Sequence, residues 1–185
     1  MKTQLNFAND YLQGAHPNIL KRMMETNQVE MTGYGTDPIT KSAIEQIREA
    51  CDCLQAEVRF LMGGTQSNQI MIDSLLQSYQ GVIAAKTGHV SVHEAGAIEF
   101  GGPKVLELDT ADGKLTAQQI KETIEDYWAD GNHEHMVMPG MVYISQPTEL
   151  GTLYSREELE AIAQVCRKHD VKLFVDGARL AYTLA

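Results

Sequence analysis

The stretch KLFVDGAR, residues 172–179, places a carboxylate directly after a short run with the pattern of a buried strand. Asp176 closes this apolar run, so its side chain begins at the mouth of a sheet, where little water surrounds it. A carboxylate in such a place needs a cationic partner. Two partners are open: Arg179 in a structural ion pair, or the protonated nitrogen of a bound heterocycle. In the second case Arg179 is available to clamp a substrate carboxylate.

Outward from this stretch, apolar strand-like runs alternate with helical patterns, which is typical of an α/β fold with a largely parallel sheet. Strands are expected at 57–61, 81–85, 104–108, 141–145 and 172–176. Helices are expected at 16–27, 36–54, 67–79, 93–100, 116–128 and 155–169. Asp37 or Thr36 is a natural N-cap, and Ser155 with Glu158 forms a capping-box pattern. In such sheets ligands bind beyond the carboxyl ends of the strands, so the loops there are where chemistry is expected.

The composition is that of an ordinary globular protein: 185 residues, 43% hydrophobic and 22% charged. A net charge of −10 argues against nucleic acid or an anionic membrane as the main partner. The sequence contains no apolar run of membrane-spanning length, and its start lacks the apolar core of a signal peptide, so we expect a cytoplasmic protein. Cys51, Cys53 and Cys166 are expected to be reduced thiols, with no metal site.

A glycine-rich turn at Gly63-Gly64 leads from the first expected strand into a helix whose first turn carries Thr65, Ser67 and Asn68. The free amides of a helix start favour an anion such as a phosphate, and glycines let the backbone approach it. The spacing is neither that of a Walker loop nor the dinucleotide fingerprint. A simple turn with an N-cap explains the same residues, so both interpretations stay open.

His89 follows the strand at 81–85, on the edge where a ligand is expected. An imidazole there can stack on a flat ring or move a proton near neutral pH, or it can be a loop histidine bonded to backbone. His89 and His93 stand four residues apart, as in metal sites, but no carboxylate or cysteine completes a ligand set. His133 and His135 are expected to be solvated loop residues.

In this order, the phosphate turn, the histidine and the strand-tip carboxylate resemble the threonine aldolase and beta-eliminating lyase family of fold-type I enzymes, which use pyridoxal phosphate. The segments that carry the resemblance are YGTDP (34–38), GGTQSNQ (63–69), GHVSVHEAGA (88–97) and DGAR (176–179). The resemblance implies a three-layer α/β large domain with a mostly parallel sheet. It also implies pyridoxal 5′-phosphate as the cofactor.

The resemblance implies roles residue by residue. Gly64 and Thr65 would hold the phosphate, His89 would stack on the pyridine ring, and Asp176 would pair with the ring nitrogen. Arg179, with Asn9 near the start of the chain, would bind the substrate carboxylate. Members of the family form homodimers or homotetramers in which the tyrosine of the first segment reaches the neighbouring site. Tyr34 is the corresponding residue here.

The sequence departs from the family pattern in two places. Thr148 stands about where many threonine aldolases have a histidine near the substrate hydroxyl. The lysine that binds the cofactor covalently is absent, because it comes a few tens of residues after the DGAR segment, and Lys172 is the last lysine here. Lys86, just before His89, is the only plausible substitute. We therefore expect a truncated chain about half as long as the whole protein, and inactive alone.

The resemblance predicts an enzyme that cleaves L-threonine or L-allo-threonine, or related β-hydroxy-α-amino acids, to glycine and an aldehyde. A β-eliminating lyase acting on another amino acid is the first alternative. A noncatalytic module that binds a phosphate ligand or serves in assembly is the second. Residues 1–40 are expected to form an N-terminal arm and helix at a subunit interface, and residues 41–185 the first part of the cofactor-binding domain. Small amino acids are the expected partners.

Overall fold

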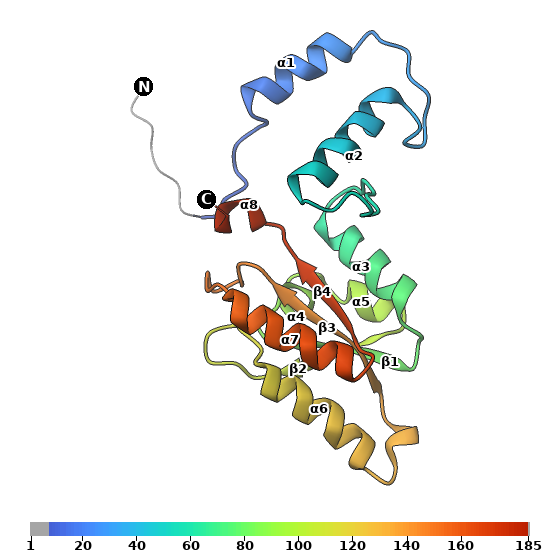
Figure 1. Ribbon diagram of the computed structural model, residues 1–185, viewed down its shortest axis with the longest axis vertical. Coiled ribbons are helices and arrows are strands. Elements are labelled where there is room, and N and C mark those ends of the chain that lie inside the picture. The colour runs from blue at the N-terminus through green and yellow to red at the C-terminus, as the bar shows by residue number, and fades with distance from the viewer. Residues whose placement is uncertain (1–7, 185) are drawn as a thin grey trace. The chain divides into compact units, whose positions relative to one another are not determined.

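The computed structural model describes residues 8–184 and divides the chain into two compact units, residues 1–60 and 61–185 (Figure 1). The division falls after Phe60. The sequence-based division into residues 1–40 and 41–185 stays a prediction. Within the described residues, no helix combines the length and the apolar character that crossing a membrane requires.

The first unit holds two helices, α1 (Pro17–Thr26) and α2 (Pro38–Ala50). Each begins with proline, whose fixed φ suits the first helical turn. The predicted cap of α2 is confirmed, since the Asp37 carboxylate accepts hydrogen bonds from the Thr40 amide at 2.8 Å and from its hydroxyl at 2.6 Å. These bonds lower the pKa of Asp37. The helix ends at Ala50, earlier than predicted, and leaves the exposed Cys51 and Cys53 in the following turn.

The second unit is built on a four-stranded parallel sheet in the order β2-β1-β3-β4. Its strands are β1 (Gln80–Ala85), β2 (Lys104–Leu108), β3 (Met138–Ser145) and β4 (Lys172–Asp176). The bounds predicted for β2 and β4 are confirmed, and β3 begins three residues earlier than its apolar run suggested. The α/β fold with a parallel sheet, predicted from the alternation of patterns, is confirmed.

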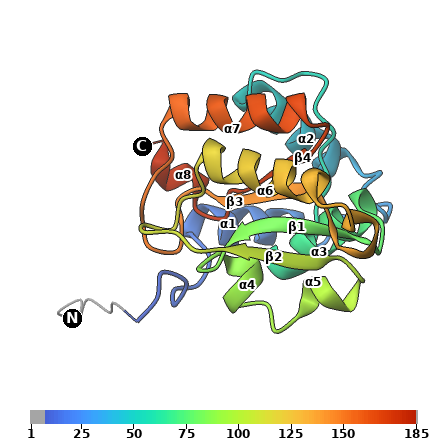
Figure 2. The ribbon, with the colours of Figure 1, turned by 90° about the horizontal axis from the view of Figure 1, so that it is seen from below.

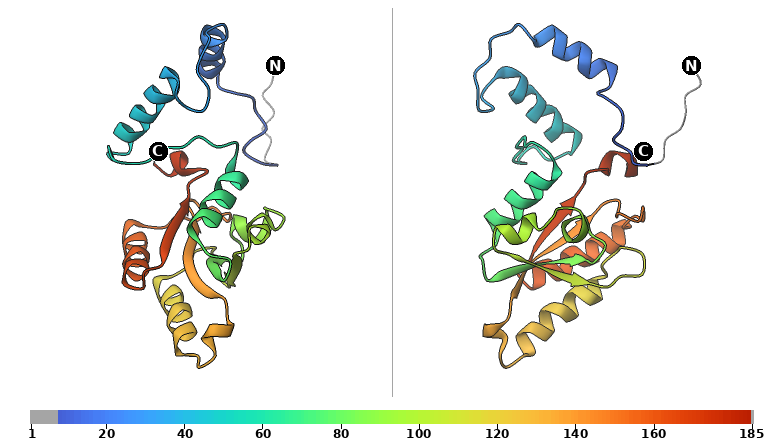
Figure 3. Two further views of the ribbon diagram at one scale, coloured as in Figure 1. Left: turned by 90° about the vertical axis from the view of Figure 1, so that its right-hand side faces the viewer. Right: turned by 180° about the vertical axis from the view of Figure 1, so that it is seen from behind.

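Helices cover both faces of the sheet and make three layers (Figures 2 and 3). One face carries α6 (Ala117–Ala129) and α7 (Arg156–Lys168). The other carries α3 (Gly64–Leu75), α4 (His89–Val92) and α5 (Ala97–Phe100). A 3₁₀ turn at His133–His135 precedes β3, and α8 (Leu180–Thr183) follows β4.

Each face has its own apolar core because alternate residues of a strand point to opposite sides. In β1, Ile83 packs with α6 and α7, whereas Val82 packs with α3, α4 and α5. Cys166 lies in the first of these cores, where burial raises its thiol pKa to about 11, so the thiol stays protonated at neutral pH. The capping box predicted for α7 is confirmed, with Ser155 and Glu158 each bonded to the other's backbone.

The strand order reverses direction between β1 and β3. From β1 the chain moves to β2 on one side, and from β3 it moves to β4 on the other. In open parallel sheets such a reversal leaves a crevice beyond the carboxyl ends of the two central strands, and ligands bind there. The segments that leave this edge are therefore the ones that carry candidate site residues.

Two sequence-based predictions of secondary structure are wrong. Residues 57–61 form no strand, because a strand needs a neighbour to pair its backbone groups, and a periodic pattern does not supply one. The helix predicted at 93–100 is only the single turn α5 at its end, and a separate turn, α4, ends just before it at Val92. Ala95, with φ 52°, and Gly96, with φ 76°, are left-handed and separate these turns.

Candidate functional site

The carboxyl ends of three strands bring candidate residues to one edge of the sheet. His89 follows β1 and opens α4, Ser145 ends β3, and Asp176 ends β4. Ser145 and Asp176 are register partners in the sheet. The backbone amide of Gln146 donates to the backbone carbonyl of Asp176 at 2.9 Å. His89 and Asp176, predicted from the sequence as site residues, thus both leave the edge of the sheet at which the strand order reverses.

Three described residues donate hydrogen bonds to the Asp176 carboxylate. The Tyr143 hydroxyl donates to Oδ2 at 2.6 Å, the Asn68 amide nitrogen donates to the same oxygen at 3.0 Å, and the Ala178 backbone donates to Oδ1 at 3.1 Å. Burial, and then the hydrogen bond to Asp176, raise the pKa of Tyr143 far above its ordinary value, so the phenol stays a donor at neutral pH. These donors fix the orientation of the Asp176 carboxylate at the tip of β4.

His89 is held by a buried carboxylate. Its Nδ1 lies 2.7 Å from Oε1 of Glu94, whose side chain has no solvent exposure, while the His89 side chain is 36% exposed. The hydrogen bond between Nδ1 and Glu94 fixes the ring orientation and leaves Nε2 as the second polar atom. Close packing of the backbone just before His89 also helps to hold this residue in place. Gly88 lies so close to the end of β1 that a Cβ atom there would be 2.9 Å from the Ala85 carbonyl oxygen.

The side-chain amide of Asn68 joins the Asp176 carboxylate to the His89–Glu94 pair. The Nδ2 atom of Asn68, a residue only 3% exposed, donates to Glu94 Oε1 at 2.6 Å and to Asp176 Oδ2 at 3.0 Å. The other Glu94 oxygen, Oε2, is buried and has no hydrogen-bond partner among the described residues. We call the connected set the switch-point network; it consists of Asn68, His89, Glu94, Tyr143 and Asp176.

The predicted phosphate turn lies at the start of α3, the helix that carries Asn68. Gly63 has φ 106°, which only glycine adopts without strain, and α3 begins at Gly64. Gly64 and Thr65 are exposed, and nothing lies within 4 Å of a Cβ built on Gly64. The first amides of the helix have no partner within it, so the turn has the donors and the open space that an anion requires.

The observed contacts of Ser67 and Asn68 differ from the sequence-based interpretation, which assigned both residues to the phosphate turn. The Ser67 hydroxyl donates to the Gly63 carbonyl at 2.9 Å, and Asn68 is buried in the network. Glu94 and Tyr143 were missed as site residues. The available signals were a glutamate directly before the left-handed pair at 95–96, and a tyrosine whose hydroxyl, in an apolar strand, must find a polar partner.

The remaining predicted residues are distributed over both units. Arg179 is half-buried at the N-terminal end of α8, three residues after the tip of β4. Asn9 and Tyr34 belong to the first unit. Asn9 accepts a hydrogen bond from the Tyr11 amide at 3.1 Å, and Tyr34 has a left-handed φ of 62°. Their assigned contacts with a substrate stay predictions.

The structure also bears on two alternatives considered from the sequence, a metal site at His89 and His93 and a cofactor lysine at Lys86. The rings of His89 and His93 have centroids 5.5 Å apart, but the described residues contain no group of three or more His, Cys, Asp or Glu able to hold a metal ion. Lys86, considered as a substitute for the cofactor lysine, forms an exposed ion pair with Asp109 at 3.3 Å. Its ammonium is therefore engaged on the surface.

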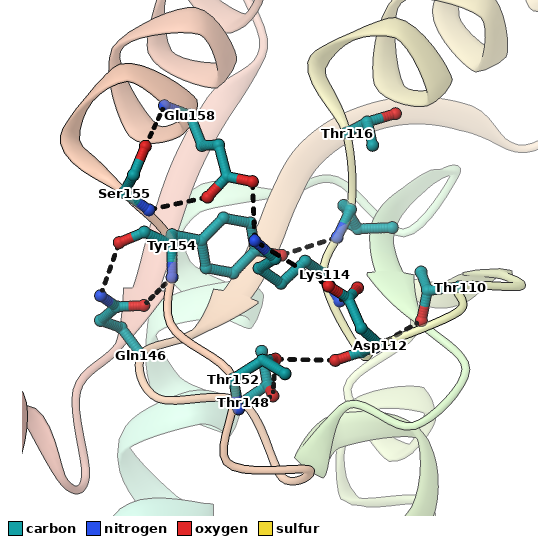
Figure 4. Close-up of polar contacts among 12 residues, drawn as sticks. Thr110, Asp112, Lys114, Thr116, Gln146, Thr148, Thr152, Tyr154, Ser155 and Glu158 are labelled. Carbon is teal, nitrogen blue, oxygen red and sulfur yellow. Dashed lines mark hydrogen bonds and ion pairs between the residues drawn. The ribbon is translucent and has the colours of Figure 1, made fainter.

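A second polar cluster fastens together the loops that follow β2 and β3 (Figure 4). The Gln146 side chain pairs with both backbone groups of Tyr154, at 3.0 and 3.1 Å, and the Tyr154 hydroxyl accepts the Leu115 amide at 2.7 Å. We call this cluster the loop clamp; it consists of Asp112, Lys114, Gln146, Thr148, Thr152, Tyr154 and Glu158.

Thr148, the residue at the position where many threonine aldolases have a histidine, belongs to the loop clamp. It is 4% exposed, and its hydroxyl lies 2.6 Å from that of Thr152, which in turn donates to the Asp112 carbonyl at 2.7 Å. Glu149, the next residue of this loop, accepts a hydrogen bond from Ser145 at 2.9 Å, and the Ser145 hydroxyl lies 3.4 Å from that of Tyr143.

Comparison with known proteins agrees with this geometry. The family model of the beta-eliminating lyases matches residues 6–183. The low specificity L-threonine aldolase of Pseudomonas aeruginosa is 36% identical over 183 residues, which are 97% of this chain and 51% of that protein. A low specificity L-threonine aldolase from another Pseudomonas strain matches equally well. The chain thus spans about half the length of these relatives.

Solved structures give the same result. The threonine aldolase of Leishmania major superposes with a TM-score of 0.89 at 43% identity, over 94% of this chain and 49% of that one. A protein from Listeria monocytogenes described as a putative L-allo-threonine aldolase superposes with a TM-score of 0.66 at 25% identity, over 90% of this chain and 45% of that one. The fold is that of the fold-type I enzymes, and the chain belongs to the threonine aldolase and beta-eliminating lyase family.

Proposed function

We propose that the whole protein is a lyase that cleaves the Cα–Cβ bond of L-threonine or L-allo-threonine, giving glycine and an aldehyde. The observation that carries the proposal is the switch-point network, in which the Asp176 carboxylate at the strand tip is linked through Asn68 and Glu94 to the His89 ring. The similarity to low specificity L-threonine aldolases over nearly the whole chain supports the same activity.

Membership of the family implies pyridoxal 5′-phosphate as the cofactor. The residues present fit this group. The open turn at Gly64 and Thr65 suits a phosphate, the partly exposed His89 ring suits a flat heterocycle, and Asp176 suits a protonated ring nitrogen. When bound, the cofactor supplies an electron sink for the charge that develops at Cα of an amino acid.

Each residue has a task in this proposal. Gly64 and Thr65 bind the phosphate, and His89 orients the ring from one side. Asp176, which the hydrogen bonds from Tyr143, Asn68 and Ala178 orient, would accept a hydrogen bond from the protonated ring nitrogen. Arg179, on the same edge, binds the substrate carboxylate with its planar fork.

The first unit completes the site in this proposal. Asn9 assists Arg179 at the substrate carboxylate, and Tyr34 reaches the site of a neighbouring copy in a homodimer or homotetramer. We further propose that the protein acts in the cytoplasm on small amino acids. Size-exclusion chromatography with light scattering tests the assembly, and a monomer that retains full activity contradicts the role of Tyr34 in a neighbouring site.

A β-eliminating lyase is the second candidate. It is favoured by Thr148, because that residue is enclosed in the loop clamp and offers no base beside a substrate hydroxyl. It needs the same cofactor contacts but releases a leaving group from Cβ instead of breaking the Cα–Cβ bond.

One assay separates the two candidates. The complete gene product, loaded with pyridoxal 5′-phosphate, is given L-threonine, L-allo-threonine, L-serine and L-cysteine in turn. Acetaldehyde is measured with alcohol dehydrogenase, and the oxo acids with lactate dehydrogenase. We expect acetaldehyde and glycine in equal amounts from at least one threonine isomer. Oxo acid from serine or cysteine, without acetaldehyde from either threonine isomer, supports the β-eliminating lyase instead.

A further inference from the structure

The side chain of Asn68 contacts both carboxylates of the switch-point network, those of Glu94 and Asp176. It lies on α3, one turn after the predicted phosphate turn, and it bonds to Glu94 and Asp176, which are 26 and 108 residues away in sequence. The same helix thus carries the start of the anion site and the amide that contacts both carboxylates.

The chemistry of this position is restrictive. A carboxamide nitrogen carries two hydrogens and can serve two acceptors at once, whereas a hydroxyl carries one and a carboxylate none. Both acceptors here are carboxylate oxygens within hydrogen-bond distance of one nitrogen, so they are close neighbours that repel each other when ionised. The shared amide offsets this repulsion.

Glu94 depends strongly on this amide. Its side chain is fully buried, Oε1 receives Asn68 and His89, and Oε2 has no partner among the described residues. A buried carboxylate with few donors shifts or protonates when one donor is removed. The orientation of His89, which rests on Glu94, then changes as well.

We propose that Asn68 is a positioning residue that couples the His89–Glu94 pair to Asp176 and ties both to the phosphate turn. It acts through these residues and not on a substrate. The inference rests on the proposed function only in taking pyridoxal 5′-phosphate as the ligand. It adds that a change in the His89–Glu94 pair alters how Asp176 holds the cofactor ring, and that a change in Asp176 alters the pair.

The test is a double-mutant cycle read from cofactor binding to the complete gene product. Glu94→Gln and Asp176→Asn are made singly and together, with Asn68 present and with Asn68→Ala. With Asn68 present we expect the two effects on the dissociation constant to depart from additivity by about fivefold or more. In the Asn68→Ala background the repulsion between the two carboxylates is no longer offset by the shared amide, so the departure should differ from that with Asn68 present by about threefold or more. An equal departure in both backgrounds overturns the proposal.

A second variant guards against simple misfolding. Asn68→Asp keeps the side-chain shape, removes both donors and adds a third carboxylate, so we expect the cofactor dissociation constant to rise about 30-fold or more. The absorption maximum of the bound cofactor should also move. Asn132→Asp is the matched control, because it makes the same change at an exposed position outside the site, and it should change neither quantity.

The outcomes separate this inference from the proposed function. If threonine is not cleaved but the coupling through Asn68 is measured, the proposed function fails and the inference stands. If threonine is cleaved and Asn68→Asp binds the cofactor with unchanged affinity and spectrum, the inference fails alone. Absence of cofactor binding by the wild-type protein overturns both.

Discussion

The switch-point network and the loop clamp are both polar clusters beyond the carboxyl ends of the strands, yet they are built differently. In the loop clamp, charges pair within the cluster: Lys114 lies 2.7 Å from Glu158, which raises the pKa of the lysine and lowers that of the glutamate. In the switch-point network, two neighbouring carboxylates share one amide donor, and one buried oxygen has no described partner.

This difference distinguishes a structural polar cluster from a ligand-binding one. A cluster whose donors and acceptors are matched holds loops in place and gains nothing from a ligand. A cluster with an excess of oriented negative charge is stabilised when a cation or a protonated ring arrives. On this ground we propose that the network is the cofactor site and the clamp its support, and each prediction below tests that division.

The largest effect is expected from Asp176→Asn. Asparagine keeps the shape but removes the charge that holds a proton on the cofactor ring, so turnover should fall on the order of 100-fold while amino-acid binding changes far less. Steady-state kinetics of the complete gene product, with cofactor occupancy confirmed by absorbance, measure this. Turnover within a few-fold of wild type, with the cofactor bound, would make Asp176 structural.

Gly64→Val probes the anion site. Nothing lies within 4 Å of a Cβ at this position, so the free protein should fold with little change in stability. A bound phosphate, however, needs close approach to the backbone, and we expect the cofactor dissociation constant to rise about tenfold or more. Fluorescence titration measures it, and unchanged affinity would remove this turn from the site.

Tyr154→Phe probes the clamp by pH. Burial raises the pKa of Tyr154 to about 12, whereas an unfolded tyrosine titrates near 10. The raised value means that this stabilisation is complete below about pH 10 and is lost as the pH rises through 12. The free energy of unfolding of the wild-type protein should therefore fall more steeply than that of Tyr154→Phe across this interval. Parallel pH profiles from urea denaturation would contradict the burial of this hydroxyl.

The smallest effect is expected from Thr148→Val. The substitution removes the hydrogen bond to Thr152 and should cost about 1 kcal/mol of stability. Turnover on a threonine isomer should stay within about twofold, because the clamp encloses this hydroxyl. A large loss of turnover at unchanged stability would show that Thr148 reaches the substrate and that the clamp is part of the site.

Local patterns predicted the scaffold well. The strands 104–108 and 172–176, the Asp37 cap and the Ser155 capping box depend on neighbouring residues, and all are confirmed. The edge of the sheet that carries His89 and Asp176 followed from strand polarity alone. The segment 57–61 failed because pairing is a property of two strands, and the helix at 93–100 failed because Ala95 adopts a conformation that alanine rarely takes.

The hydrogen bonds that connect the site residues could not be predicted from sequence patterns. Asn68 meets Asp176 across 108 residues, and Tyr143 reaches it from the neighbouring strand. Neither contact has a local signature, since both depend on the register of β3 and β4 and on how α3 packs over them. Asn68 therefore looked like part of a phosphate turn, and its second role became visible only in three dimensions.

The central claim is tested most directly by cofactor titration of a matched pair, Tyr143→Phe and Tyr154→Phe, in the complete gene product. Each loses one buried phenol hydroxyl, the first from the network and the second from the clamp. We expect Tyr143→Phe to weaken pyridoxal 5′-phosphate binding about tenfold, because Asp176 loses its shortest hydrogen bond. Tyr154→Phe should bind like wild type. Equal affinities of the two variants, or weaker binding by Tyr154→Phe, would contradict the assignment of the cofactor to the switch-point network.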